Sequence, residues 1–311
     1  MDLSIIIVNY KSRDWLDRCL QSIARDVPPP GPEIIVIDNE SGDGSVSMLK
    51  EKYPQVVLLE NEENLGFAKA CNQGAEIATG RYFFFLNPDS EITRGTRSRV
   101  VRFMDSHAEV GVGGCGLYYP DEKAQVFAYK FTRLSNLVGR ALLLYSFLPR
   151  NRITAPLFRD YLRPGEPVEA VCGGAMVVRR EAFEDVGSFD DSLFLYYEDE
   201  DLCYRMKQRG WGIVAIPDTR IIHHYDQSSK KNIRMAIFSC HRSHFLFYRK
   251  FHPLFKVVLF RAIQFLGFSI RSAFWLLKLA SARREEPVKQ RFLGYLSLLL
   301  SDFCYRRTLV K

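Results

Sequence analysis

Hydrophobic and polar positions alternate in blocks along the first 90 residues. Four short runs are almost wholly apolar and rich in β-branched or aromatic residues, at positions 3–8, 33–37, 56–59 and 82–86. Such runs are typical of parallel strands that are buried on both faces. Between them, apolar residues recur at helical spacing, as they do from Trp15 to Ile23. The alternation of strand and helix predicts an α/β fold with a doubly wound, mostly parallel, Rossmann-like sheet.

The pattern loosens after about residue 110. Further strands are expected at 111–119, 168–178, 213–216 and 220–224, and helices at 181–186 and 199–209. Residues 120–167 carry no clear periodicity, so we expect a variable loop or lid there.

The last 78 residues, 234–311, form a different segment that we expect to be a helical, amphipathic extension. Its longest uncharged stretches, residues 262–270 and 292–301, have nine and ten residues, whereas a membrane span needs roughly 17–25, so a simple transmembrane helix is not expected. On a helix, Lys256, Arg261, Arg271 and Lys278 share about 140° of arc and the opposite face is apolar. This pattern predicts a helix lying in the membrane plane with a cationic face. The alternative is a helix that packs on the protein's own core.

Charge is distributed unevenly between the two parts of the chain. Residues 230–311 carry 17 Lys or Arg and 3 Asp or Glu, whereas the remaining residues carry 26 and 33. The net charge of +7 therefore combines an acidic body with a basic extension, and a basic extension favours a polyanionic partner such as a membrane surface or a nucleic acid.

The composition is that of a globular protein, with 47% hydrophobic and 25% charged residues. The seven cysteines are odd in number and include no C-x-x-C pair, which argues against a disulfide framework and suits a reducing cytosol. The N-terminus leads directly into a strand pattern, so we expect no signal peptide.

Polar residues that could bind a ligand or take part in catalysis follow the predicted strands. They occur at Asp38 and Asn39, at Asn87 and Asp89, from Glu198 to Asp201, and at His223. Ligands of open α/β sheets bind at the carboxyl ends of the strands. We therefore expect these segments to form one site.

Two of these residues predict a metal site. A carboxylate such as Asp89, at the mouth of an apolar strand, can hold Mg²⁺ or Mn²⁺ together with substrate phosphate oxygens, and the cation neutralises charge as a diphosphate departs. His223 is the candidate second ligand. The alternatives are a proline turn capped by Asp89 and a structural strand histidine.

The acidic cluster from Glu198 to Asp201 has two interpretations. Crowded carboxylates raise at least one pKa, which suits a general base. Acidic residues also stabilise a helix N-terminus, and Asp201 with Arg205 forms an i,i+4 pair. We expect both to hold, with Asp199 as the base and Glu200 and Asp201 serving the helix.

Two further sites are candidates for substrate contacts. Asp38 can accept hydrogen bonds from a ribose or a base imide, or can instead cap the following helix. Gly173 and Gly174 allow close approach of an acceptor sugar, or can instead form a bulge.

Six motifs, taken in order, resemble glycosyltransferase family 2, and most of all its rhamnosyltransferase-like branch, which acts on bacterial cell-surface glycans. The similarity extends over about residues 3–228. The motifs lie at residues 4–10, 36–41, 64–67, 86–89, 173–180 and 197–205.

The resemblance implies a GT-A fold and inverting transfer from a nucleotide-activated sugar. It implies a glycosyltransferase domain over residues 1–233, with a nucleotide-sugar half at about 1–110 and an acceptor half at about 111–233. The implied roles are donor binding by Asn9, Asp38, Asn39, Asn64, Gly66, Asn87 and Asp89, metal binding by Asp89 and His223, acceptor binding by Gly173, Gly174 and Glu198, and base catalysis by Asp199. The family's usual metal motif has two aspartates, and here Asn87 replaces the first, which places more weight on His223.

By the same resemblance, the donor is a nucleotide-diphosphate sugar, with dTDP-rhamnose favoured over UDP- or GDP-sugars. The acceptor is a glycan or a polyprenyl-diphosphate-linked sugar. The basic extension then predicts a cytoplasmic enzyme attached peripherally to the anionic inner face of the plasma membrane, with no nucleic acid as partner.

Two other functions compete with this interpretation. A sugar nucleotidyltransferase shares the sheet, but it usually has a glycine-rich loop after the first strand, and residues 8–12 contain no glycine. A non-catalytic nucleic-acid-binding protein would suit the pI of about 9.0, but the acidic body and the lack of a nucleic-acid motif argue against it.

Overall fold

The computed structural model describes residues 1–26, 31–144, 160–161, 168–224, 232–281 and 285–304, and side chains at all of these except 160, 161, 281 and 302–304. The chain divides into two compact units. The first comprises Met1–Phe131 and Asp160–Ser228, and the second comprises Thr132–Arg159 and Ser229–Lys311. The sequence predicted a single boundary at residue 233, and it did not predict that the segment from Thr132 would group with the C-terminal helices.

The first unit is built on an eight-stranded sheet of order β3-β2-β1-β4-β10-β6-β11-β5. Its strands are β1 (Leu3–Asn9), β2 (Glu33–Asn39), β3 (Val57–Asn61), β4 (Tyr82–Leu86), β5 (Ser90–Ile92), β6 (Val110–Tyr118), β10 (Ala175–Arg179) and β11 (Gly212–His223). Strands β1 to β4 are parallel, as expected. Strand β10 is antiparallel to both of its neighbours and β5 is antiparallel to β11, so the complete sheet is mixed.

Two strand predictions were wrong in detail. The single strand expected at 168–178 is divided at Gly173 and Gly174 into β9 (Ala170–Val171) and β10. Strand β9 belongs to a small second sheet with β7 (Ala128–Tyr129) and β8 (Asp160–Tyr161). Conversely, the two closing strands expected near the C-terminal end of this unit form one strand, β11, which is irregular between Ile216 and Ile221.

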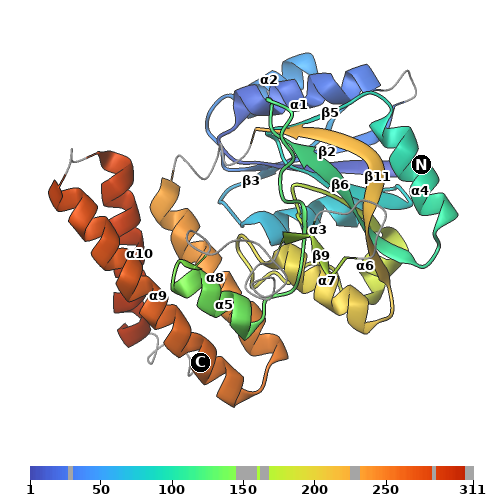
Figure 1. Cartoon of the computed structure of the whole chain (residues 1–311). Helices are drawn as coiled ribbons and strands as arrows, with labels where there is room; N and C mark the ends of the chain where they lie inside the picture. Colours follow the sequence, from blue (N-terminus) through green and yellow to red (C-terminus); the bar gives the residue numbers. More distant parts are fainter. Residues whose placement is uncertain (27–30, 145–159, 162–167, 225–231, 282–284, 305–311) are drawn as a thin grey trace. The chain divides into compact units, whose positions relative to one another are not determined.

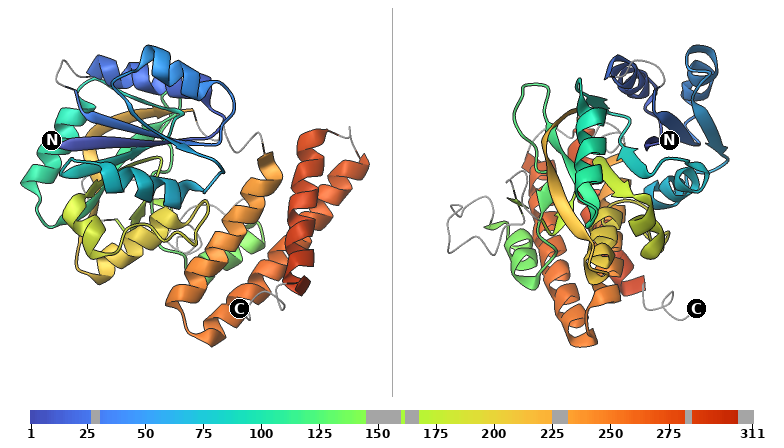
Figure 2. Two further views of the ribbon diagram at one scale, coloured as in Figure 1. Left: turned by 180° about the vertical axis from the view of Figure 1, so that it is seen from behind. Right: turned by 90° about the vertical axis from the view of Figure 1, so that its right-hand side faces the viewer.

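Helices cover both faces of the large sheet (Figure 1). Helices α1 (Arg13–Asp26) and α2 (Ser45–Lys52) lie on one face, and α3 (Phe67–Ile77), α6 (Arg180–Asp185) and α7 (Glu198–Gln208) lie on the other, as the turned views confirm (Figure 2). Helix α4 (Thr96–Ser106) packs against β11. This is the layered arrangement that buried parallel strands require.

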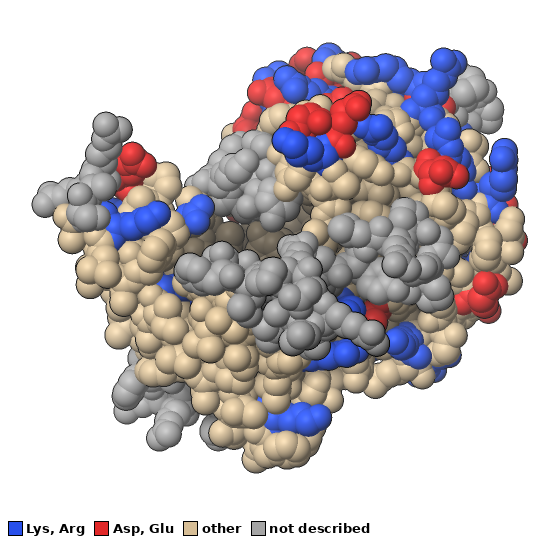
Figure 3. All heavy atoms as spheres, viewed as in Figure 1, with Lys and Arg blue, Asp and Glu red and all other residues tan. Residues whose placement is uncertain are grey.

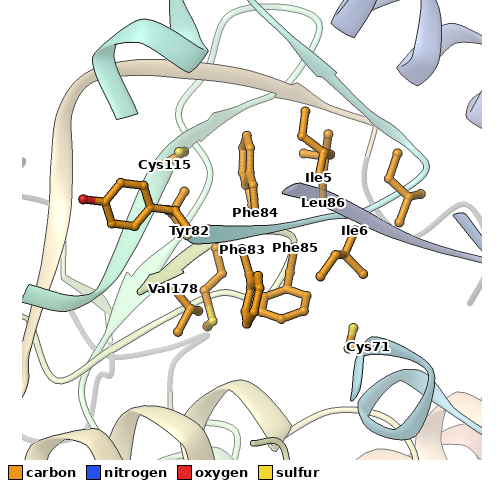
Figure 4. Packing of buried hydrophobic residues seen from close by; sticks show 14 of the residues in the cluster. Ile5, Ile6, Cys71, Tyr82, Phe83, Phe84, Phe85, Leu86, Cys115 and Val178 are labelled. Atoms are coloured by element: carbon orange, nitrogen blue, oxygen red, sulfur yellow. The ribbon is translucent and has the colours of Figure 1, made fainter. Parts of the chain in front are cut away.

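Strand β4 forms the centre of the core, and all five of its residues are buried. Successive side chains point to opposite faces, so that Phe83 and Phe85 pack near Phe183 of α6 while Phe84 lies on the other side (Figure 4). The aromatic run therefore contributes to both apolar layers and holds the end of β4, and with it Asn87, in a fixed place.

The second unit is helical. It contains α5 (Leu134–Ala141), α8 (Ile233–Phe251), α9 (Leu254–Ser281) and α10 (Glu286–Cys304). Helix α9 packs against the other three, around a small core of Leu137, Phe245, Tyr248, Val257 and Phe260. By length and composition, Leu254–Ala280 is the one described helix that could cross a membrane. A well-buried helix of a water-soluble protein can meet the same criterion.

One cation of the predicted cationic face of α9 is turned towards its own unit. Arg271 donates hydrogen bonds to the backbone carbonyls of Arg140 and Ala141 in α5. The same side of α9 contributes Val257 and Phe260 to the small core, so α9 packs on its own unit, whereas membrane binding by α9 stays a prediction. Large apolar residues on the other side of the helix are exposed.

Candidate functional site

The ends of β1 and β2 hold the first part of the site. Asn9 and Asp38 are opposite each other in register, and both are buried. Asp38 Oδ1 accepts a hydrogen bond from Asn9 Nδ2 at 2.8 Å, and Oδ2 accepts one from the Ser41 backbone N–H at 3.0 Å. Asp38 does not cap the next helix, because the N-cap of α2 is Gly44. Its carboxylate is instead oriented rigidly at the carboxyl edge of the sheet.

Asn39 links β2 to the loop before α3. Its Nδ2 donates to the Gly66 carbonyl at 3.0 Å and lies 3.4 Å from Asn64 Oδ1. Its Oδ1 accepts from Nδ2 of Asn61, the last residue of β3. Asn61 and Ser41 were not among the predicted residues, although the strand-end rule that selected Asp38 applies equally to Asn61.

The second part of the site lies where β4 and β11 end. His223 Nε2 is 3.3 Å from Asp89 Oδ1, and both side chains are buried. Gln125 fixes the histidine ring. Its Nε2 donates to the His223 carbonyl at 2.6 Å, so that its Oε1 faces His223 Nδ1 at 2.9 Å. Because Gln125 Oε1 can only accept, this pattern assigns a proton to Nδ1 and leaves Nε2 directed towards Asp89.

This pair fits a divalent cation. An imidazole nitrogen and a carboxylate oxygen are both metal ligands, and Nε2 and the Asp89 oxygen lie 3.3 Å apart. Octahedral Mg²⁺ or Mn²⁺ with bonds of about 2.0–2.1 Å places neighbouring ligands about 3 Å apart. Among the described residues, no three or more His, Cys, Asp or Glu side chains are grouped to hold a metal. The protein thus offers this pair, and other ligands would come from substrate or water.

Gly173 and Gly174 connect this pair to the acidic cluster. A Cβ on Gly174 would lie 3.3 Å from Asn87 Nδ2 and 3.7 Å from the His223 ring, whereas a Cβ on Gly173 would meet Asp199 at 3.6 Å. The backbone N–H of Gly173 donates to Asp199 Oδ2 at 3.0 Å. The two glycines thus bring Asn87, His223 and Asp199 together.

Helix α7 begins at an unusual turn. Tyr196 and Tyr197 both have positive φ, 66° and 68°, a region that costs non-glycine residues energy and is often retained at functional sites. This turn places Asp199 in the first turn of α7, where its Oδ1 also accepts from the Glu200 backbone N–H at 2.8 Å.

The neighbouring carboxylates differ from Asp199. Asp201, whose side chain is fully buried, pairs with Arg205 at 2.6 Å, which confirms the predicted i,i+4 pair. Glu198 is buried, and its Oε2 has no hydrogen-bond partner among the residues that the structure describes. Burial, followed by the charge of Asp199, raises the pKa of Glu198 well above its usual value, which favours the protonated form. Its role in acceptor binding stays a prediction.

The predicted residues therefore fall into two connected groups within the first unit. Asp89, His223 and Asp199 are linked through Asn87 and the two glycines. The Asp38 group lies beyond β1, which separates β2 from β4. Two strand spacings amount to about 10 Å, which is within the span of a nucleotide.

Comparison with known proteins agrees with this geometry. Residues 4–187 match the sequence profile described as "Glycosyl transferase family 2". The chain is 29% identical over 257 residues to the N-acetylglucosaminyl-diphospho-decaprenol L-rhamnosyltransferase of Mycobacterium tuberculosis, covering 79% of this chain and 83% of that protein. It is 27% identical over 229 residues to the O-antigen biosynthesis protein RfbC of Myxococcus xanthus, covering 72% of this chain but 17% of that protein.

Solved structures share the fold. The mannosyltransferase PcManGT from Pyrobaculum calidifontis, in complex with GDP-Man and Mn²⁺, has a TM-score of 0.59 and 17% identity, covering 96% of this chain and 87% of that one. GalNAc-T7 with UDP, GalNAc and Mn²⁺ has a TM-score of 0.52 and 19% identity, covering 71% and 43%. The predicted GT-A fold with a C-terminal helical extension is thus confirmed. The profile match spans more than half of the sequence, and the chain belongs to glycosyltransferase family 2.

Proposed function

We propose that this glycosyltransferase is an inverting, metal-dependent enzyme of cell-surface polysaccharide synthesis. It moves a sugar, with rhamnose favoured, from a nucleotide-diphosphate donor to a glycan or polyprenyl-diphosphate-linked acceptor. The observation that carries the proposal is the connection of the Asp89–His223 pair to Asp199 through Gly173 and Gly174.

The donor would lie along the strand ends. Asp38, held by Asn9 and Ser41, would accept hydrogen bonds from the base or ribose, and the loop of Asn64 and Gly66, tied to Asn39, would frame the nucleoside. The diphosphate would extend past β1 to Asn87 and Asp89. A divalent cation bound by Asp89 and His223 would neutralise negative charge on the leaving diphosphate.

Asp199 would act as the general base. It would take the proton of an acceptor hydroxyl, whose oxygen bonds to the anomeric carbon while the bond from that carbon to the diphosphate oxygen breaks. Attack from the face opposite the leaving group inverts the anomeric configuration. The acceptor would be bound beside Gly173 and Gly174, with Glu198 at the same helix start.

The donor and the location are proposed from a relative and from the charge of the chain. The relative of Mycobacterium tuberculosis is named as an L-rhamnosyltransferase and for a diphospho-decaprenol-linked sugar, which supports rhamnose as the sugar and a lipid-linked acceptor. We favour dTDP-rhamnose as the donor, with UDP- and GDP-sugars as the alternatives. The basic C-terminal segment supports a cytoplasmic enzyme attached peripherally to the inner face of the plasma membrane.

A thermal-shift screen of nucleotide sugars with and without Mn²⁺ tests the proposal. We expect one nucleotide sugar to raise the melting temperature, and Mn²⁺ to enlarge the increase. Transfer from that donor to a lipid-linked acceptor should yield the opposite anomeric configuration by NMR. Retained configuration, or a donor effect that is indifferent to metal and chelator, would contradict the mechanism.

A further inference from the structure

Helix α9 exposes a continuous apolar face. Exposed residues recur every three or four positions along the helix, as a single helical stripe requires. The large members of this stripe are Phe255, Val258, Leu259, Phe265, Leu266, Leu276 and Leu277, with exposed fractions from 47% to 70%. In Figure 3 the surface of the C-terminal helices is mostly without charged side chains. From Phe255 to Leu277 the stripe extends about 33 Å at 1.5 Å per residue.

The opposite side of α9 faces its own unit and combines apolar with polar residues. Val257, Phe260 and Phe268 are buried there together with Gln264 and Ser272, and Arg271 is fixed by the carbonyls of Arg140 and Ala141. The helix therefore buries polar residues inside its unit while it leaves large apolar residues exposed, whereas a surface helix of a water-soluble protein turns its apolar side inward and its polar side outward.

We propose that this stripe inserts among the acyl chains of one membrane leaflet, with α9 lying in the membrane plane. The inference rests on the proposed function in one respect, which is that the acceptor sugar is linked to a membrane lipid. Because Gln264, Arg271 and Ser272 occupy the inner side, α9 is not apolar all round, which suits lying in the interface rather than crossing the bilayer.

Lipid fits the stripe better than a protein partner because of what borders it. Lys278 lies over the rings of Phe274 and Trp275, and Arg291 of α10 lies over Trp275. Aromatic rings with neighbouring cations are typical of the level of lipid headgroups. Residues 230–311 also carry 17 basic and 3 acidic residues, which complements anionic headgroups.

This assignment changes the expected mode of attachment. If cations alone held the protein, binding would require anionic lipid and would be lost in salt. Insertion of the stripe predicts binding that persists on neutral vesicles and at high salt, with anionic lipid adding affinity through exposed cations such as Lys278 and Lys289.

Vesicle flotation of the full-length protein tests the inference. The variant Phe265→Gln, Leu266→Gln, Leu277→Gln removes apolar contact, and Gln retains helix propensity. The matched control carries Gln at Val57, Ile77 and Val126, which are 42–45% exposed in the first unit. On neutral phosphatidylcholine vesicles at high salt, we expect the parent and the control to float. The α9 variant should bind about tenfold or more weakly, because burying one apolar side chain away from water already contributes about this factor to the affinity.

Three results would overturn the inference. The α9 variant could float as the parent does. The parent could bind anionic vesicles alone and dissociate in salt. The variant could also be a smaller oligomer than the parent in lipid-free solution, which would assign the stripe to a second copy of this chain. Sugar transfer to a water-soluble acceptor analogue distinguishes a failure of this inference from a failure of the proposed function. The rate of this transfer should be equal in variant and parent. If neither protein transferred sugar, the proposed function would be contradicted and the flotation result would still stand.

Discussion

The carboxylate of Asp199 accepts a hydrogen bond from the backbone N–H of Gly173, with Oδ2 and N 3.0 Å apart. This bond ties the first turn of α7 to the connection between β9 and β10. Because the next residue, Gly174, packs against the side chains of Asn87 and His223, one dipeptide separates the proposed base from the proposed metal ligands. Any shift of this dipeptide should therefore disturb both groups together.

The variant Asp199→Asn should bind donor normally and lose transfer. The amide keeps one oxygen that can accept from Gly173 and gives up the bond from the Glu200 N–H, which the helix start can lose without unfolding, but it cannot take a proton. General-base catalysis contributes about 10²–10⁴-fold, and we expect a loss of that size in single-turnover transfer. Thermal shift with the donor should not change. Asp121→Asn, at an exposed position, is the control, and full turnover by Asp199→Asn would refute the base assignment.

The variant Gln125→Leu should weaken metal binding while leaving the ligands in place. Gln125 holds both the ring and the carbonyl of His223, and loss of such a partner typically costs about 10–100-fold in metal affinity. Calorimetric titration of the free protein with Mn²⁺ measures this change in affinity. Gln21→Leu, in which the lost bond is to Asp17, should match the parent. An unchanged Mn²⁺ affinity in Gln125→Leu would exclude His223 as an oriented ligand.

The parallel part of the fold and its strand-end residues were predictable from local pattern. Strands β1, β2 and β4 each contain an unbroken apolar run of four or five residues, and parallel strands bring their carboxyl ends to one edge. Asp38 and Asp89 follow two of these strands, so their placement depended on the strand pattern alone.

Other features depend on contacts between distant parts of the chain. Gln125 reaches His223 across 98 positions of sequence, and nothing beside Gln125 in the sequence marks this role. Strands β9 and β10 looked like one strand because glycines interrupt an apolar run without changing its polarity. In α9, helical periodicity placed the four cations on one side, but it did not show that Val257 and Phe268 are buried on that side, because periodicity does not identify which face meets α5.

The variant Gly66→Ala should destabilise the first unit. Gly66 has φ +84° and ψ 177°, a conformation open in practice only to glycine, and an added Cβ would collide with the backbone carbonyl of Phe194. Strain and collision together should cost about 2 kcal/mol or more in the free energy of unfolding. Urea denaturation measures the loss. Gly210→Ala has a similar φ of +87° but no atom within 4 Å, so it isolates the conformational strain and should cost about 1 kcal/mol. Equal losses would show that the contact with Phe194 is not tight.

The variant Glu198→Gln should change how stability depends on pH. Burial and the adjacent Asp199 raise the pKa of Glu198 in the folded protein, so the folded state binds this proton more tightly than the unfolded chain. The corresponding stabilisation is complete below the unfolded pKa of about 4.3, and it is lost as the pH rises through the folded pKa. Gln mimics the protonated form at every pH. Urea denaturation across a pH series should therefore show the variant equal to the parent in acid and more stable at neutral pH. Glu76→Gln, at an exposed position of α3, should follow the parent throughout. If the free energy of unfolding of Glu198→Gln followed that of the parent at all pH values, Glu198 would have to be ionised in the folded protein. Asp199 would then have a second negative charge beside it.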